Sequence, residues 1–363
     1  MATATEPATD SRPEHDAAAS VAIDEALVVD VGRPDGPAGS HAPTSGEEDA
    51  SPAADLATPA GPRLHQVTML LAVVLPLAGF AYGLWTAWTT GHFGWLEAAF
   101  LLGGLWLGGQ GITVGYHRLL THRSFETTPA IRGFFMMLGA LTVQMSPLHW
   151  CAVHRKHHAH SDKPGDPHSP HYVGDEPAGD SVWGQLRGLW HAHTGWLFTG
   201  HMVLTDHEKY VPDLVRDPLA MFIHRTWELL WAPLSFLLPT LLGWAIRGDA
   251  SGAWAGFLWG GLARTFLLHH VTWSVNSICH AYGQREFACR DESRNNLWCA
   301  LVTSGEGWHN NHHAFPSSAR LGLRWWQLDT GWWIIRGLEA VGLAWDVKVP
   351  TEQQQAKRRT AEA

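Results

Sequence analysis

Residues 95–122 read W-L-E-A-A-F-L-L-G-G-L-W-L-G-G-Q-G-I-T-V-G-Y-H-R-L-L-T-H, an apolar run that leads into two histidines. A helix from Trp95 to Tyr116 is long enough to cross about 30 Å of hydrocarbon. His117 and His122 therefore follow where this helix leaves the bilayer. On an ideal α-helix, residues five apart lie about 140° apart around the axis. The two imidazoles can converge only at a helix end or in a loop.

Three further segments are predicted to cross the membrane, at about 66–88, 226–246 and 250–275. Arg264 lies inside the last of them, and a charge in lipid is costly, so it should face protein or water, or lie where the span ends. Residues 131–148 are apolar but short and contain Pro147, which favours a buried or interfacial helix. The sequence thus predicts an all-α integral membrane protein with four transmembrane helices.

The charge distribution predicts the orientation of these spans. Four spans place both termini and residues 118–225 on one side, which holds nearly all the Lys and Arg, whereas residues 89–94 have neither. By the positive-inside rule that side is cytoplasmic, and all the histidine clusters then share it in a helical cap. Tryptophans near the predicted span ends fit an aromatic belt at the membrane interface. They are Trp85, Trp88, Trp95, Trp227, Trp244 and Trp273.

Composition separates a membrane domain from two tails. Only 16% of the 363 residues are charged, against roughly 25% in soluble domains. Residues 1–62 are rich in Ala, Pro and acidic residues and are predicted to be disordered; 63–345 form the membrane domain and 346–363 a polar C-terminal tail. The net charge of −9 comes largely from the first tail, and without a basic patch nucleic acid is not an expected partner. The four cysteines show no C-x-x-C spacing and are expected to be free thiols.

Two more histidine clusters have the spacing i, i+3, i+4, which places three side chains on one helix face. They are His154, His157 and His158 in H-R-K-H-H, and His309, His312 and His313 in H-N-N-H-H. Neutral imidazole binds iron, copper, nickel and zinc. With His117 and His122 this makes eight ligands, too many for one ion and enough for two, so a dimetal centre is predicted. The histidines without a repeated spacing are not expected to be ligands: His160, His168, His171, His191, His193, His201 and His207.

The boxes H-R-L-L-T-H, H-R-K-H-H-A-H-S-D and G-E-G-W-H-N-N-H-H-A-F-P, with the stretch Asn276-Ser-Ile-Cys-His280, resemble the membrane-bound fatty acid desaturases. The resemblance covers roughly residues 65–345 and is to the stearoyl-type (acyl-CoA delta-9) branch, in particular its bacterial members. It implies a protein of the bacterial plasma membrane that holds two irons, with Trp150 in the wall of a substrate tunnel. The ligands that it implies are His117, His122, His154, His157, His158, His280, His309, His312 and His313, with Asn276 reaching one iron through water.

The implied reaction is the introduction of a cis double bond into a saturated acyl chain, with O2 as co-substrate and two electrons supplied from outside. An unactivated methylene has no acidic proton and no leaving group, so a metal and dioxygen must carry this chemistry. The sequence contains no nucleotide, flavin, haem or ferredoxin motif, which predicts a separate electron donor such as a ferredoxin or a reductase. Asp162, Asp166 and Glu306 are candidates to accept the distal N–H of ligand histidines.

The acyl carrier is less strongly indicated. Animal acyl-CoA enzymes of this family carry an Arg-Asp pair before the second box and an Arg-Lys pair after an H-x-G-W-L stretch. This chain has Ala152-Val153 and Phe198-Thr199-Gly200 at those places. A coenzyme A thioester is slightly preferred over a lipid-bound chain, because other cations on the same side could compensate. These are Lys163, Arg187, Lys209, Arg216 and Arg225.

Two other classes of protein are considered. A diiron fatty acid hydroxylase or alkane monooxygenase would insert oxygen instead of removing a second hydrogen, and the N-x-x-x-H and G-E-G-x-H-N stretches argue against it. A non-enzymatic, histidine-rich metal-binding protein that transports or stores metal would line a path through its spans with ionisable residues. Only Arg264 qualifies.

Overall fold

The computed structural model of the chain describes residues 62–199 and 206–360, which are mostly helical. The predicted N-terminal tail and His201 lie outside these residues, apart from Pro62. The described strands form two small antiparallel sheets, which agrees with the predicted all-α class. Strand β1 (Glu126–Thr127) pairs with β4 (Ala344–Trp345), and β2 (Tyr172–Val173) pairs with β3 (Glu176–Pro177).

Three helical segments of the described chain are long and apolar enough to cross a membrane: 66–90, 95–121 and 218–247. They coincide with the first three predicted spans and extend them by a few residues. The first lies in α1 (Pro62–Thr90). The second comprises α2 (Trp95–Ala98), η3 (Ala99–Gly103), α3 (Gly104–Gln110) and η4 (Gly111–Thr121). The third comprises α9 (Pro218–Thr226), η6 (Trp227–Trp231) and α10 (Ala232–Arg247).

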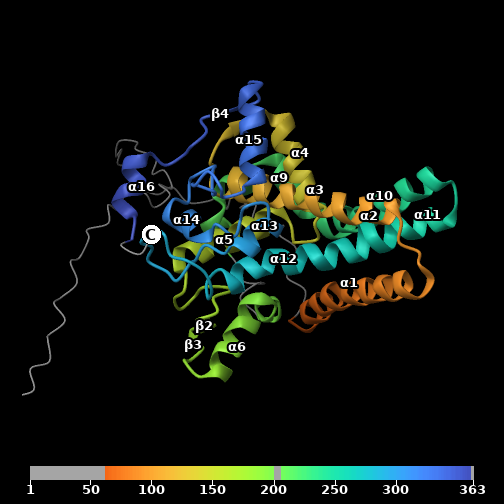
Figure 1. Cartoon of the computed structure of the whole chain (residues 1–363), viewed down its shortest axis with the longest axis horizontal. Helices are drawn as coiled ribbons and strands as arrows, with labels where there is room; N and C mark the ends of the chain where they lie inside the picture. Colours follow the sequence, from red (N-terminus) through yellow and green to blue (C-terminus); the bar gives the residue numbers. More distant parts are fainter. Residues whose placement is uncertain (1–61, 200–205, 361–363) are drawn as a thin grey trace, which may run out of the picture. The chain divides into compact units, whose positions relative to one another are not determined.

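The fourth predicted span is a continuous helix of similar length beside the other three (Figure 1), but it is not among the segments that are apolar enough to cross a membrane by composition. It comprises α11 (Ala250–Ala255), η7 (Gly256–Ala263) and α12 (Arg264–Ile278). Arg264 is buried and donates to the carbonyl oxygens of Gly260 (2.9 Å) and Leu141 (3.0 Å) and to Ser235 Oγ (2.6 Å). The predicted protein-lined surroundings of this cation are confirmed, because protein oxygens satisfy its donors.

Small residues let the long helices approach closely. A Cβ on Gly243 of α10 would lie 2.1 Å from the carbonyl oxygen of Gly252 in α11, so only glycine fits this contact. In the same way, a Cβ on Gly115 of η4 would lie 2.8 Å from the carbonyl oxygen of Phe135. Packing between small residues is the usual means by which helices associate in lipid, where apolar burial supplies little drive.

The apolar stretch at 131–148 is confirmed as something other than a span. It contains the short helix α4 (Pro129–Ala140) and the start of α5 (Pro147–His160). On α4, Phe135 and Met136 are buried, while Phe134 and Met137 are exposed. The helix therefore packs one face on the protein and leaves the other free, as expected of a buried or interfacial element.

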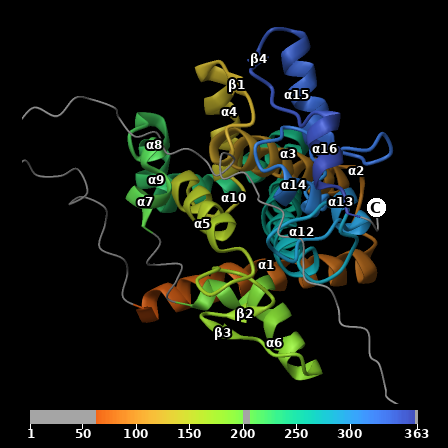
Figure 2. The same ribbon diagram turned by 90° about the vertical axis from the view of Figure 1, so that its left-hand side faces the viewer.

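The remaining helices gather at one end of the long helices (Figure 1). In Figure 2, α5 lies between α7 to α9 on one side and α12 and α14 on the other. The additional elements are α6 (Val182–His193), η5 (Gly195–Phe198), α7 (His207–Tyr210), α8 (Pro212–Val215), α13 (Leu297–Val302), α14 (His309–Ala314), α15 (Thr330–Ala340) and α16 (Glu352–Arg358). The C-terminal segment is held to this cap by two hydrogen bonds of Arg358. Its side chain donates through Nη1 to the Ala314 carbonyl (2.7 Å), and its backbone carbonyl accepts from Ala288 N–H (2.7 Å).

Two other expectations have clear outcomes. The four cysteines are free, as predicted.

Of the tryptophans assigned to the aromatic belt, Trp85, Trp88, Trp95 and Trp244 are more than half exposed. The assignment is wrong for Trp273, which is buried among cap and span residues. Trp227 is half-buried and donates through Nε1 to the Ala140 carbonyl (3.1 Å).

Candidate metal centre

The first histidine pair converges because its helix ends in a wide turn. Residues 111–121 form a π-helix, and the His122 N–H donates to the His117 carbonyl at 3.1 Å. Hydrogen bonds from i to i+5 place residues five apart next to each other along the axis. The two ring centroids are 4.8 Å apart. The five-residue spacing that does not suit an α-helix is therefore accommodated by a π-helical end, and no loop is needed.

The other two boxes lie on α5 and α14. Ser146 caps α5 by accepting from His149 N–H (3.3 Å), and Pro147 follows as its first residue. Helix α14 has only six residues, too few to be stable without tertiary contacts. The asparagines of H-N-N-H-H supply them: Asn310 Oδ1 accepts from Phe287 N–H (2.7 Å), and Asn311 Nδ2 donates to the Leu321 carbonyl (2.8 Å).

The nine histidines fall into two sets, in each of which the candidate ligand nitrogens lie within 4.8 Å of one another. The first set is His117, His122, His154, His158 and His312, and the second is His157, His280, His309 and His313. Neighbouring Nε2 atoms are close: His158 and His312 are 2.9 Å apart, and His280 and His309 are 3.0 Å apart. The structure thus brings together every histidine that the sequence and the resemblance proposed.

Four buried carboxylates hold the outer nitrogens of these rings. The Nδ1 atom of His157 lies 3.0 Å from Asp166, and that of His280 lies 2.8 Å from Asp162. The Nδ1 atom of His313 lies 2.8 Å from Asp291, and that of His117 lies 2.6 Å from Glu306. A proton on Nδ1, shared with the carboxylate, leaves Nε2 with its lone pair directed at the other rings. Three of these carboxylates were predicted. Asp291 was missed, because it lies 22 residues from His313 and no sequence pattern links the two.

The close Nε2 atoms fit a metal ion. Two imidazole lone pairs about 3 Å apart repel each other unless a cation lies between them. Two nitrogens that bind one ion at about 2.1 Å each lie roughly 3 Å apart. Neighbouring Nε2 atoms here are 2.9–3.1 Å apart. The spacing therefore fits nitrogens that share a bound metal ion.

Electrostatics act differently on different rings of the site. Burial would lower the pKa of His280, but the charge and hydrogen bond of Asp162 outweigh it and raise that pKa. Burial, reinforced by neighbouring rings, holds the pKa values of His154, His158 and His312 well below the ordinary value. Burial alone would raise the pKa of Asp166, but the charge and hydrogen bond of His157 outweigh it and lower that pKa to about 2. The pKa of Asp162 is lowered in the same way by His280. Neutral imidazole is the form that binds a metal.

Arg118 holds the Glu306 carboxylate through an ion pair. Its guanidinium is fully buried, with Nη2 lying 3.3 Å from Glu306 Oε1 and 2.8 Å from Asp329 Oδ1. Thr113 also donates its hydroxyl to Glu306. The arginine of the first box therefore points away from the histidines and orients the partner of His117.

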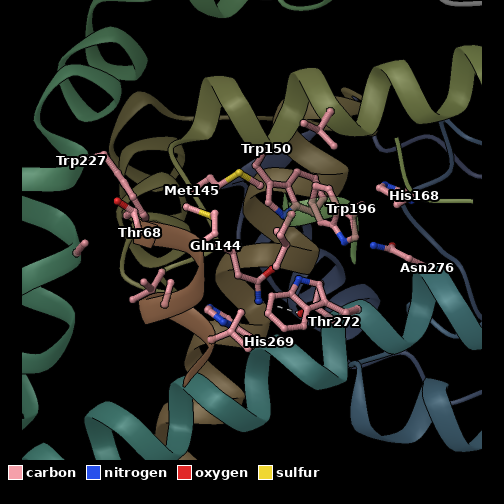
Figure 3. A pocket seen from close by; sticks show the side chains of 18 of the residues that line it. Thr68, Gln144, Met145, Trp150, His168, Trp196, Trp227, His269, Thr272 and Asn276 are labelled. Atoms are coloured by element: carbon pink, nitrogen blue, oxygen red, sulfur yellow. Dashed lines mark hydrogen bonds between the residues drawn. The ribbon is translucent and has the colours of Figure 1, made fainter. Parts of the chain in front are cut away.

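A mainly apolar cavity of about 390 Å³ is lined by His154 of the first histidine set. Its wall includes Trp150, whose ring stacks on His154 with centroids 5.1 Å apart. Asn276 lines the same end of the cavity, close to His168 (Figure 3). Further along, Gln144 Nε2 donates to Thr272 Oγ1 at 2.9 Å. Trp150 and Asn276 both line this cavity. Their roles in a substrate tunnel and in a water-mediated contact stay predictions.

The loop between α4 and α5 contributes strained backbone to this wall. Val143 and Met145 have φ values of 60° and 77°, a region that residues other than glycine rarely adopt. Such conformations cost on the order of 1–3 kcal/mol each and concentrate at functional sites. Here they flank Gln144, and all three residues line the cavity. The sequence shows no glycine that would have indicated this turn.

The histidines predicted not to be ligands lie outside the two sets, as far as the structure describes them. His168 comes closest: it is buried, and its ring packs against His157 with centroids 4.4 Å apart. His171 donates through Nε2 to the His280 carbonyl (2.8 Å), which holds the end of α12. His193 contacts Ser277 Oγ (3.0 Å) and His270 Nδ1 (2.9 Å).

Apolar helices capped by two histidine sets define a membrane-type protein that could hold two metal ions. The family model described as fatty acid desaturase matches residues 93–347. The chain belongs to this family and is an oxygen-dependent fatty acid desaturase, an oxidoreductase.

Three similar proteins have different acyl carriers in their names. The chain is 45% identical to a hex-5-enoyl-[acyl-carrier protein] acetylenase of Moorena producens (strain JHB), over 72% of this chain and 80% of that one. It is 35% identical to the sn-1 stearoyl-lipid 9-desaturase of Anabaena variabilis, over 82% and 99%. It is 39% identical to the acyl-CoA C20 Delta5-desaturase of Anemone leveillei, over 68% and 72%.

Proposed function

We propose that the chain is a diiron desaturase that introduces a cis double bond at the delta-9 position of a saturated, stearoyl-type acyl chain. The observation that carries the proposal is the two histidine sets, with Nε2 separations of 2.9–3.1 Å, the first of which contributes His154 to the wall of an apolar cavity. The nine histidines would hold two irons, and Asn276 would contact one of them through water. Bound iron would supply the activation of dioxygen that removal of hydrogen from an unactivated methylene requires.

The overall reaction balances with an external reductant. A saturated chain, O2, two electrons and two protons give the cis alkene and two molecules of water. Since the chain has no motif for a redox cofactor, we assign the electrons to a separate ferredoxin or reductase. The residues of the chain would position the substrate: the cavity excludes water, and Trp150 beside His154 places one methylene pair next to the centre.

We also propose that the acyl chain arrives bound to a membrane lipid. Among the described residues that line the cavity, only Thr68 and Glu228 are exposed, which supports a mouth between α1 and η6, in two helical segments that can cross a membrane. The described lining residues include no Lys or Arg. The cations that were expected to compensate for a missing coenzyme A site are exposed and do not line the cavity: Lys163, Arg187, Lys209, Arg216 and Arg225.

This proposal departs from the slight preference for coenzyme A that was based on sequence. Coenzyme A carries several phosphate charges, and the carboxylate of Glu228 at the mouth would repel them. A lipid needs no cation inside the cavity, since its headgroup stays at the membrane surface. Arg63 and Arg225 are exposed on the same two helical segments and could contact a lipid phosphate there.

The proposed topology has four spans, with 250–278 as the fourth, and with both termini and the histidine sets in the cytoplasm. It rests on the alignment of that helix with the other three (Figure 1) and on the Lys and Arg content of residues 118–225. We place the protein in the plasma membrane of a bacterium, because of the bacterial members that its motifs resemble.

Expression in a host without desaturases tests the reaction. We expect monounsaturated chains with the double bond at position 9, located by mass spectrometry of derivatised fatty acids. A product heavier by one oxygen would identify a hydroxylase and contradict the proposal. The inactive control is a variant in which His157 on α5 and His309 on α14, both in the second set, are replaced by alanine.

A further inference from the structure

Helix α6 carries large apolar side chains on the face that points away from the protein. Their exposed fractions are 76% for Val182, 77% for Trp183, 52% for Leu186 and 63% for Trp190. At about 100° per residue, these four positions form a stripe about 100° wide along one side of the helix. An amphipathic helix of a soluble protein would turn this stripe towards the core.

The opposite face of α6 is fixed to the cap. Gly184, Gly188, His191 and Ala192 are buried there. A Cβ on Gly188 would lie 1.8 Å from the Pro170 carbonyl oxygen, so this face is in backbone contact with the segment before strand β2. The helix cannot turn its stripe inward without losing this contact, so the apolar side chains need a partner outside the described protein.

The end of α6 is attached to the membrane helices. The 3₁₀ turn η5 follows directly, and its Trp196 and Leu197 pack in one cluster with Trp273 of α12 and Val73 of α1. His193, the last residue of α6, contacts His270 and Ser277 of α12. In Figure 1 the hairpin β2–β3 lies on the side of α6 turned away from the long helices. The face of α6 that packs towards this hairpin lies opposite the stripe. The stripe therefore faces the side on which the membrane helices lie.

We propose that α6 lies in the interface of the lipid bilayer, with Val182, Trp183, Leu186 and Trp190 inserted between phospholipids of the leaflet on the cap side. The helix leads directly into η5, which packs against α1, a helix that can cross a membrane. Tryptophan and leucine on one face, with polar Gln185 and Arg187 at its borders, are typical of helices that lie in this plane. The helix fixes the depth of the cap relative to the bilayer.

The surrounding charge distinguishes a bilayer from a soluble protein as the partner. Asp175, Glu176 and Asp180 are exposed just before α6, so an acidic electron donor would be repelled here. The same carboxylates disfavour anionic lipids, and apolar insertion alone must hold the helix. The proposal therefore predicts insertion into a purely zwitterionic bilayer. It is independent of the reaction that the metal centre performs.

Site-directed spin labelling of the full chain in phosphatidylcholine nanodiscs tests this proposal. Leu186→Cys and Trp190→Cys report on the stripe, and Glu176→Cys on the hairpin is the matched control. The native Cys151, Cys279 and Cys299 are buried, and a labelled wild-type sample measures the background from half-buried Cys289. Metal content and gel filtration show whether each variant is folded.

We expect the labels at 186 and 190 to be relaxed more strongly by lipid-soluble O2 than by a water-soluble nickel chelate, and the label at 176 to show the reverse. Stronger relaxation by the nickel chelate at both stripe positions would overturn the proposal and identify the stripe as a surface for a soluble partner. Insertion that occurs only with anionic lipid would also overturn it, because the charge argument would then be wrong.

Discussion

Asp162 and His280 are 118 residues apart in sequence, and Asp162 Oδ2 lies 2.8 Å from His280 Nδ1. The same carboxylate accepts from Glu292 N–H (2.8 Å) and from Ser169 Oγ (2.6 Å). Asp162 has a φ of 54°, so its backbone is in the left-handed region. One carboxylate thus joins the end of the second histidine box to the turn after α12 that carries His280, and a left-handed backbone conformation positions it.

Replacing Asp162 by alanine is expected to weaken the second histidine set selectively. Partners of ligand histidines typically contribute 10–100-fold to metal affinity or activity. We expect D162A to lose one of two irons under mild chelation and to lose activity in that range. D162N, which keeps an oxygen able to accept from Nδ1–H, should lose less. Equal metal retention in D162A and wild type, measured by elemental analysis, would contradict this role.

A second prediction concerns the count of metal ions. Alanine at His154, His158 or His312 should abolish desaturation, because each removes a nitrogen from a set in which neighbours lie about 3 Å apart. His160→Ala is the matched control, since it lies on the same helix outside both sets. We expect about two irons per chain in wild type and in H160A. Full activity with one metal per chain would rule out a dimetal site.

Local spacing explains which parts of this site could be predicted from sequence. His154, His157 and His158 have helical periodicity, so their convergence follows from one helix. His280 has no such pattern and was recognised only through the resemblance of the surrounding stretch. Asp291 and the strained Val143 depend on contacts between distant segments, which leave no trace in local sequence.

The fold shows the same division. Long apolar runs predicted three spans closely, because length and hydropathy decide whether a helix can cross a membrane. The helix at 250–278 contains Arg264 and two histidines, so its crossing depends on the residues packed around it. The π-helix at 111–121 was not predicted, although the five-residue spacing of its histidines is the i to i+5 period of such a turn.

A third prediction concerns acid stability through Arg155 of the second box. Arg155 pairs with Asp213 through two contacts, at 2.6 Å and 3.0 Å. Burial alone would raise the pKa of Asp213, but Arg155 and Arg123 lower it to about 2. Since the folded pKa lies below the unfolded one, the stabilisation is complete above about pH 4. It is lost as the pH falls from about 4 to about 2.

Thermal unfolding of wild type and D213N across pH measures this contribution. Above about pH 5, D213N should be less stable by on the order of 1–3 kcal/mol, the range for hydrogen bonds to charged groups. The difference should shrink between about pH 4 and pH 2, where wild-type Asp213 becomes protonated. A difference that stays constant down to pH 2 would show that Asp213 does not titrate in this window.

The last prediction concerns the acyl carrier and follows from the cavity mouth. Purified enzyme with its electron donor is offered labelled stearoyl-coenzyme A and labelled phosphatidylcholine in one nanodisc preparation, and the alkene is followed in each pool. We expect most of the product in the lipid pool, because the lining residues that the structure describes offer no cation to the phosphates of coenzyme A. Removing the negative charge with Glu228→Gln should improve use of the thioester several-fold, since one repulsion at the mouth is lost. If the thioester is desaturated in preference to the lipid, the lipid assignment fails. The proposed dimetal centre would be unaffected, because its evidence is the histidine geometry.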